Sequence, residues 1–450
     1  MSIKYKSFLG TIKKLFAHSM VNDSIFMSAS QYLPIGIEFV KAILVTRILG
    51  PSGYGMVGLV TAYPLLLSSF TNVKSVSITS RYISVFLATN QKDSVRSICK
   101  LTYVLDLLTS VTALLLVAAT GWWVSGSIYK LHELYYLMLI YALSFPLLSP
   151  AGTSRAILLS FQCFRWIAIL NILSQVIMFV FVIFFLLLGF AVPGVIFAMV
   201  LGSLVNSLTM TYIANHVLHK NGFRHWWSAS FQSLEILKKE LFSFFSWNYL
   251  MVTLTGLVSQ VPLILLGHFK GAKEVGFYRF AMNVMMLGNS LESSLSNVVY
   301  PRLSTRWALG EQESLKRSLK LWTKYGGIFA SMIVIITFLL PIIIPVIFGS
   351  DYTPAIKSAQ ILMASNALSL MFFWLISFYY STGRYNLWIK AYIVYTALYI
   401  TLGLPVTERW GCMGLAVLTT AIKVIFSLIM ISFVVTKWEI FVKRPVSETN

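Results

Sequence analysis

Charged residues are scarce in this chain of 450 residues, at 11% of the total. A soluble domain carries roughly 25% charged residues, because its surface must be hydrated. With 57% apolar residues, most of this protein's surface must instead face an apolar phase. Runs of about 20 apolar residues, long enough for a helix to cross the roughly 30 Å bilayer core, recur along the sequence. The composition therefore predicts an all-α integral membrane protein.

Cysteine clusters, metal-ligand spacings and catalytic motifs are also lacking. The three cysteines, Cys99, Cys163 and Cys412, are scattered and typical of small apolar fillers. No glycine-rich phosphate loop, metal-spaced histidine cluster or Ser/His/Asp arrangement falls on a connector. We therefore expect a protein that is not an enzyme and needs no cofactor, with any driving force supplied by a proton or sodium gradient or by consumption of the product on the far side of the membrane.

Hydrophobic runs predict twelve transmembrane helices. Their ranges are 25–48, 54–80, 98–121, 134–160, 166–189, 191–215, 241–267, 276–300, 325–348, 358–382, 387–404 and 410–436. The connectors between them are short, the longest internal ones being 216–240 and 301–324. Function must therefore lie within the helices or at their ends.

Acidic residues are few, 15 against 35 Lys and Arg. One alternate set of connectors, which includes both termini, holds 25 Lys and Arg, and the other holds about six. Because cytoplasmic loops retain positive charge, we expect a multi-pass protein of the bacterial inner membrane with both termini in the cytoplasm. The charge forms no single basic stripe, which excludes a nucleic-acid partner and leaves attraction to membrane lipids as a secondary effect.

Several features recur at an offset near 220 residues. Gly50 and Gly55 recur as Gly271 and Gly276, and the further pairs are Arg81 with Arg302, Arg165 with Arg384, and Gly194 with Gly414. The ordinary explanation is that helix ends need glycine, but every pair occupies the same topological place. We expect two parallel six-helix lobes with a central cavity and a substrate path between them, formed by residues 1–220 and 241–450 and joined by a cytoplasmic linker at 221–240.

The stretch 46–55, Thr-Arg-Ile-Leu-Gly-Pro-Ser-Gly-Tyr-Gly, resembles the polysaccharide flippase (Wzx-type) family. Residues 275–281, 301–304 and 348–352 resemble the same family, and the resemblance covers nearly the whole chain in length, span count and motif order. It implies membership of the multidrug/oligosaccharidyl-lipid/polysaccharide exporter (MOP) superfamily. It also implies a V of two bundles, with a cavity lined mainly by the first, second, seventh and eighth helices.

The resemblance further implies a substrate, an undecaprenyl-pyrophosphate-linked oligosaccharide carried from the cytoplasmic to the periplasmic leaflet for O-antigen or related polysaccharide assembly. A polysaccharide polymerase and a chain-length regulator are the expected protein partners. A membrane polymerase or ligase of the same pathway is the first alternative, but it would carry a large periplasmic loop. A multidrug antiporter of the superfamily is the second, and its cationic substrates would call for an excess of buried acids.

Charged residues inside spans cost several kcal/mol each by insertion scales and usually face protein or a wet cavity. Seven lie inside the predicted spans: Lys41, Lys74, Arg279, Lys423, Glu38, Asp106 and Glu292. We expect the four cations to form a route for the anionic head group, with Arg81 and Arg302 at its cytoplasmic end. Asn283 follows Arg279 on the same face of the eighth span.

Each of these residues also has a structural interpretation. Lys74 and Arg279 could extend to the headgroups, Arg81 and Arg302 could anchor span ends, and polar stripes could serve helix packing. Glu38, Asp106 and Glu292 are the candidate proton or sodium sites. Glu38 is the favoured one because Lys41 lies one turn away, although the two side chains could simply neutralise each other.

Overall fold

The computed structural model describes residues 2–72, 76–232 and 238–442, and this part of the chain is helical throughout apart from short turns. The helices in chain order are α1 (Ser2–Thr71), α2 (Val76–Ala88), α3 (Lys92–Trp123), η1 (Val124–Ile128), α4 (Leu134–Ala142), α5 (Ser144–Ser160), α6 (Phe164–Leu187), α7 (Ala191–Lys220), η2 (Trp226–Ser228), α8 (Lys238–Phe269), α9 (Ala272–Ala308), α10 (Gln312–Phe348), η4 (Ser350–Ala355), α11 (Ile356–Met371), α12 (Leu375–Ser381), α13 (Tyr385–Thr436) and α14 (Trp438–Val442). Seven of the described helices, or eight if α11 and α12 form one bent span, are long and apolar enough to cross a membrane.

The helices fall into two compact units. Unit 1 comprises Met1–Val45, Leu67–Trp122 and Tyr135–Val252, and unit 2 comprises Thr46–Leu66, Trp123–Leu134 and Thr253–Asn450. The part of α1 that follows the kink at Gly50, called its second arm below, is therefore grouped with the C-terminal helices as far as Leu66. The lobe boundaries expected from the sequence repeat stay a prediction.

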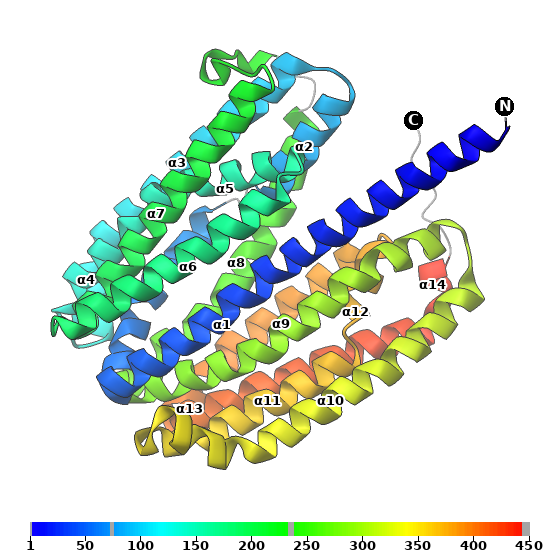
Figure 1. The fold of residues 1–450 in the computed structure, drawn as a ribbon. Helices are drawn as coiled ribbons and strands as arrows, with labels where there is room; N and C mark the ends of the chain where they lie inside the picture. The colour runs from blue at the N-terminus through cyan, green and yellow to red at the C-terminus, as the bar shows by residue number, and fades with distance from the viewer. Residues whose placement is uncertain (1, 73–75, 233–237, 443–450) are drawn as a thin grey trace. The chain divides into compact units, whose positions relative to one another are not determined.

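Unit 1 is built around α7, which packs against α5 and α6, while α2 packs against α5. At the end where α3 begins, its core contains Ile98 of α3, Ile157 of α5 and Leu218 of α7, all fully buried. In unit 2, α11 packs against α9, α10 and α13, and these helices run alongside one another (Figure 1). Its core includes Leu303 of α9 and Phe378 of α12.

Two predicted connectors are reduced to kinks at single glycine residues. The first predicted span and the start of the second lie within α1, on either side of Gly50 (φ 62°, ψ −179°), which is not helical. The last two predicted spans lie within α13, which has the same kind of break at Gly411 (φ 55°, ψ −139°). Glycine enters this left-handed region without a steric penalty, so one residue can redirect the chain where a loop was expected.

Two predicted spans are also divided. The range 54–80 contains the end of α1 at Thr71 and the start of α2 at Val76. The range 358–382 is interrupted between α11 and α12, which are bent by 44°. Phe372, with φ −117° and ψ 35°, leaves the helical conformation at this break.

Helix ends recur at the predicted offset. Each of the five residues with positive φ in the second half of the described chain has a counterpart with positive φ 219 to 222 positions earlier: Gly271 with Gly50, Gly310 with Asn90, Gly349 with Lys130, Gly383 with Gln162, and Gly411 with Gly189. Left-handed backbone costs an ordinary residue roughly 1–2 kcal/mol, so coincidence at all five turns is improbable. The equivalence of Gly50 and Gly271, predicted from the sequence, is confirmed at the level of the backbone.

The second arm of α1 crosses α9 in backbone contact. A Cβ built on Gly55 would lie 1.7 Å from the carbonyl oxygen of Ala272, and one built on Gly276 would lie 1.9 Å from the carbonyl oxygen of Pro51. Pro51 and Ala272 are themselves counterparts in the repeat, so the same contact is made in both directions. Small residues permit such an approach between membrane helices.

Candidate functional site

Arg279 and Asn283 lie on one face of α9, and both contact Tyr54 of α1. The guanidinium carbon of Arg279 is 4.8 Å from the centre of the Tyr54 ring, within the range of a cation–π contact. Nη1 of Arg279 also donates to the Tyr54 carbonyl oxygen over 3.5 Å, and the Asn283 amide donates to the Tyr54 hydroxyl. Tyr54 is only 4% exposed, whereas the other two are half-buried. One buried ring therefore orients two predicted substrate residues.

The glycine crossing leaves the space in which Arg279 lies. A Cβ built on Gly58 would be 3.2 Å from Cδ of Arg279 and 3.1 Å from Cγ1 of Val275. Contacts this tight would require the arginine side chain to shift by a few tenths of an ångström. The lack of a side chain at Gly58 therefore leaves room for the stem of Arg279.

Glu292, Asn366 and Lys423 form a second polar cluster within unit 2. Nζ of Lys423 on α13 donates to Oδ1 of Asn366 on α11 over 3.0 Å, and the ammonium group interacts electrostatically with the Glu292 carboxylate on α9. Nδ2 of Asn366 donates to the carbonyl oxygen of Met285 over 2.5 Å. Gly288 leaves room for this amide, since a Cβ there would lie 2.5 Å from Nδ2. The structure thus brings together Glu292, which the sequence predicts as a proton or sodium site, and Lys423, which it predicts as a substrate-binding cation.

The chemistry of this cluster follows from its charges. The charges of Lys423 and Glu292 attract each other without forming an ion pair among the described residues, and the group that contacts the ammonium is Asn366. Asn366, fully buried, holds the cation through its carbonyl oxygen and ties α11 to α9 through its amide. A change in the charge of Glu292 on α9 would therefore alter the contacts of α11 and α13 as well.

Lys41 and Glu38 form an ion pair one turn apart on α1. Lys41 is 7% exposed, and its Nζ lies 3.9 Å from Sδ of Met178 on α6. The carboxyl side chain of Glu38 is 45% exposed. Mutual neutralisation, one of the two interpretations of the sequence, is present in the structure. The roles in substrate binding and ion coupling stay predictions.

Asp106 takes part in polar contacts between helices of unit 1. Thr153 on α5, which is fully buried, donates to Oδ2 of Asp106 on α3 over 2.7 Å. Its neighbour Ser154 lies 2.8 Å from the Tyr103 hydroxyl and donates to Thr211 on α7 over 3.1 Å. These are two separate sets of contacts: Thr153 joins α5 to the Asp106 carboxylate on α3, and Ser154 joins α5 to α3 and α7 through hydroxyl groups.

The remaining predicted residues lie apart from these clusters. Arg81 on α2 and Arg302 on α9 are exposed, which fits either a headgroup anchor or the entrance to a route. Lys74 lies outside the described residues. Within the described ranges no three His, Cys, Asp or Glu side chains are grouped so as to hold a metal ion.

Sequence reasoning missed the residues that position the charged groups. Tyr54 was noted only as part of a glycine motif, and Asn366 and Thr153 were not singled out. An asparagine inside an apolar span was the available signal for Asn366, because a buried amide needs partners. Nothing in the sequence pairs Tyr54 with Arg279.

Most of the chain matches a known protein family. A family described as "Polysaccharide biosynthesis protein" matches residues 20–307. No curated protein matches the chain.

Solved structures resemble the protein over nearly its whole length. A multidrug resistance MATE family transporter of the MOP superfamily, in an inward-facing conformation, is 14% identical with a TM-score of 0.76, covering 92% of this chain and 98% of that one. A MATE transporter from Vibrio cholerae is 11% identical with a TM-score of 0.61, covering 95% and 98%. A MOP superfamily transporter from Pyrococcus furiosus, with a binding pocket of reverse polarity, is 14% identical with a TM-score of 0.64, covering 94% and 96%. The protein therefore has the twelve-helix, two-lobe fold of these membrane proteins, as predicted.

Proposed function

The chain belongs to the polysaccharide biosynthesis protein family, and on this premise we propose that it flips an undecaprenyl-pyrophosphate-linked oligosaccharide from the cytoplasmic to the periplasmic leaflet by alternating access. The comparisons show a member of the polysaccharide biosynthesis protein family with a multi-pass fold that resembles transporters of the MOP superfamily. The transporter fold favours this function over a polymerase or ligase.

The observation that carries the proposal is the environment of Arg279. Its contacts are the Tyr54 ring and the Tyr54 carbonyl oxygen, and neither neutralises its positive charge. In the described part of the chain no carboxylate pairs with it. A guanidinium group has five N–H donors in a planar fork, so a half-buried one retains donors for phosphate oxygens. An anionic pyrophosphate fits such a group, whereas a cationic drug does not.

Weak binding suits a transported head group. A cation–π contact is worth about 0.5–2 kcal/mol, so Arg279 is oriented without being locked in place. The Asn283 amide, one turn along α9, offers a neighbouring hydrogen-bond donor. Substrate attracted to this position can therefore be released again, and we assign Lys41, Lys74, Arg81, Arg302 and Lys423 the remaining steps of the route.

Ion coupling is assigned to the three predicted acids. The charge of Glu292 attracts that of Lys423, so protonating this carboxylate would remove an attraction between α9 and α13. Glu38 forms an ion pair with Lys41, which protonation of the Glu38 carboxylate would likewise weaken. The proposal includes a location in the bacterial inner membrane, both termini in the cytoplasm, and work beside a polymerase and a chain-length regulator.

The test is complementation of a flippase-deficient bacterial strain, scored for surface glycan and normalised to protein abundance. Arg279→Ala should lower glycan at least tenfold, because the uncompensated charge is lost, while Arg279→Lys should retain part of the function. Lys273→Ala is the matched control, since Lys273 is an exposed cation in the first turn of the same helix.

A different pattern would count against the proposal. Wild-type glycan levels with Arg279→Ala at normal abundance would mean that the substrate does not use this cation. Parallel loss of abundance and glycan would assign Arg279 to helix packing alone.

A further inference from the structure

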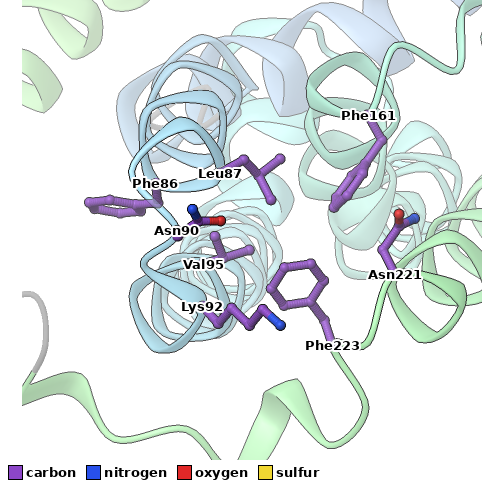
Figure 2. A pocket seen from close by; sticks show the side chains of 8 residues that line it. All are labelled: Phe86, Leu87, Asn90, Lys92, Val95, Phe161, Asn221 and Phe223. Carbon is purple, nitrogen blue, oxygen red and sulfur yellow. The ribbon is translucent and has the colours of Figure 1, made fainter.

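Two neighbouring pockets lie at the end of unit 1 where α3 begins and α7 ends. Figure 2 shows the smaller, an apolar hollow of about 160 Å³ lined mainly by aromatic and aliphatic side chains such as Phe86, Phe161 and Phe223. Lys92 also lines it. The larger pocket has a volume of about 550 Å³ and is lined by polar and charged residues, among them Arg224 and His225. The transport route proposed above uses neither.

Both pockets lie where spans end. The helices that can cross the membrane begin at Lys92 (α3) and Phe164 (α6) and end at Ser160 (α5) and Lys220 (α7). The ends of membrane-spanning helices lie at the level of the lipid headgroups or beyond it. Both pockets are therefore placed on the headgroup side of the hydrocarbon core.

Positive charge is concentrated around the larger pocket. The segments 92–100 and 220–232 together contain five Lys and Arg and one acid: Lys92, Arg96, Lys100, Lys220 and Arg224 against Asp93. The acid is already paired, since Nη1 of Arg96 lies 3.2 Å from its Oδ1. The remaining charge is that of cations without a carboxylate.

Some of these cations hold the pocket together. Nη2 of Arg96 donates to the Gly222 carbonyl oxygen over 3.3 Å, and Nζ of Lys100 donates to that of Ala229 over 2.9 Å. Ser97 on the same helix donates to the Ser230 carbonyl oxygen over 2.6 Å. The segment after α7 is thus fastened to α3 by these three side chains.

Arg224 and His225 are different. Both side chains are exposed and line the larger pocket, and neither has a hydrogen-bond or ion-pair partner within the described ranges. His225 has a left-handed backbone (φ 57°), which turns the chain directly after Arg224. Two unpartnered donors therefore stand in a pocket whose walls are fixed.

We propose that the larger pocket binds the phosphate headgroup of an anionic phospholipid of the surrounding bilayer, with Arg224 and His225 as its ligands. Basic pockets at the ends of membrane helices are suited to such headgroups. A bilayer phospholipid fits better than free phosphate because lipid headgroups already lie on this side of the hydrocarbon core.

The test measures binding of phosphatidylglycerol to the purified full-length protein by native mass spectrometry, with phosphatidylethanolamine for comparison. Arg224→Ala combined with His225→Asn is the variant, since asparagine tolerates the left-handed backbone. A cation near the surface contributes about fivefold in affinity, so binding of phosphatidylglycerol should weaken at least fivefold. Arg224→Lys should restore part of the affinity.

The control variant is Arg317→Ala combined with Lys320→Ala. These exposed cations lie on α10, the counterpart of α3, where Lys316 and Glu313 at 3.7 Å repeat the Arg96–Asp93 pair. Phosphatidylglycerol should bind this variant as it binds the wild type. Equal losses in the two variants would mean that only general surface charge is at work, and the proposal would fail.

Three further outcomes would overturn the proposal. Equal binding of the two lipids to the wild type would show that no phosphate site discriminates between headgroup charges. Displacement of phosphatidylglycerol by millimolar inorganic phosphate would assign the pocket to a free anion. Displacement by an equimolar isoprenoid pyrophosphate would assign it to the transported substrate. Because no step requires transport, the result does not depend on the proposed function.

Discussion

Replacing Gly276 by alanine tests how closely α1 and α9 are required to approach. The new Cβ would lie 1.9 Å from the Pro51 carbonyl oxygen and 3.2 Å from the Gly55 nitrogen. Backbone atoms cannot turn aside as a flexible side chain can, so the helices would have to separate by about 1.5 Å to restore ordinary contact. Overpacking of this kind typically costs 1–3 kcal/mol, and here we expect about 3 kcal/mol.

The measurement is thermal unfolding of the purified protein in detergent. Unfolding entropy is about 2.1 cal/mol/K per residue, so 3 kcal/mol in a chain of 450 residues lowers Tm by about 3 °C. Gly327→Ala is the matched control, because a Cβ at this helical position on α10 meets nothing within 4 Å. Its Tm should stay unchanged or rise slightly, since alanine is the better helix former.

The reciprocal contact allows a sharper test. Gly55→Ala should cost about as much as Gly276→Ala, since its Cβ would lie 1.7 Å from the Ala272 carbonyl oxygen. One separation of the helices makes room for both methyl groups, so the double variant should lose much less than the sum of the single losses. Fully additive losses, or a Gly276→Ala protein that melts with the control, would refute this account of the crossing.

Three other substitutions test the polar contacts. Tyr54→Phe keeps the ring beside Arg279 but removes the acceptor of Asn283, so glycan at normal abundance should fall by less than with Arg279→Ala; an equal fall would contradict the division of roles. Asn366→Leu leaves the Lys423 ammonium without its acceptor and should destabilise by about 1–3 kcal/mol, seen as a lower Tm, whereas a higher Tm would show that the bond is dispensable. Glu274→Ala removes the carboxylate that accepts from the backbone nitrogen of Cys412 over 2.9 Å, just after the turn at Gly411, and should lower stability by about 0.5–2 kcal/mol; an unchanged Tm would count against this cap.

Positions where the backbone needs glycine were the feature of the molecule that the sequence predicted best. Gly50 and Gly271 are visible in the chain because only glycine takes their conformation freely, and their spacing correctly predicted equivalent helix ends. Span length and hydrophobicity predicted the fold class for a similar reason, since a helix that crosses the bilayer core needs about 20 apolar residues. The sequence around the break near Phe372 contains neither proline nor glycine, so the break could not be predicted from local sequence.

Contacts between helices were harder to predict. Periodicity placed Arg279 and Asn283 on one face, but it does not say which helix that face meets, so Tyr54 went unrecognised as their partner. Glu292 and Lys423 lie 131 positions apart and come together only through the packing of α9, α11 and α13. A single sequence gives the direction of a side chain around its own helix and no more.

The crossing of α1 and α9 has the symmetry of a homodimer interface formed within one chain. In such an interface each patch contacts its own copy, so any residue placed on it appears twice. Here the counterparts have diverged: Arg279 corresponds to Gly58, Tyr54 to Val275, and Asn283 to Ala62. The contacts among Tyr54, Arg279 and Asn283 therefore occur once in the crossing and are not repeated by their counterparts. Joining the two halves in one chain lets a symmetric scaffold carry a single cation, which two identical half-chains could not do.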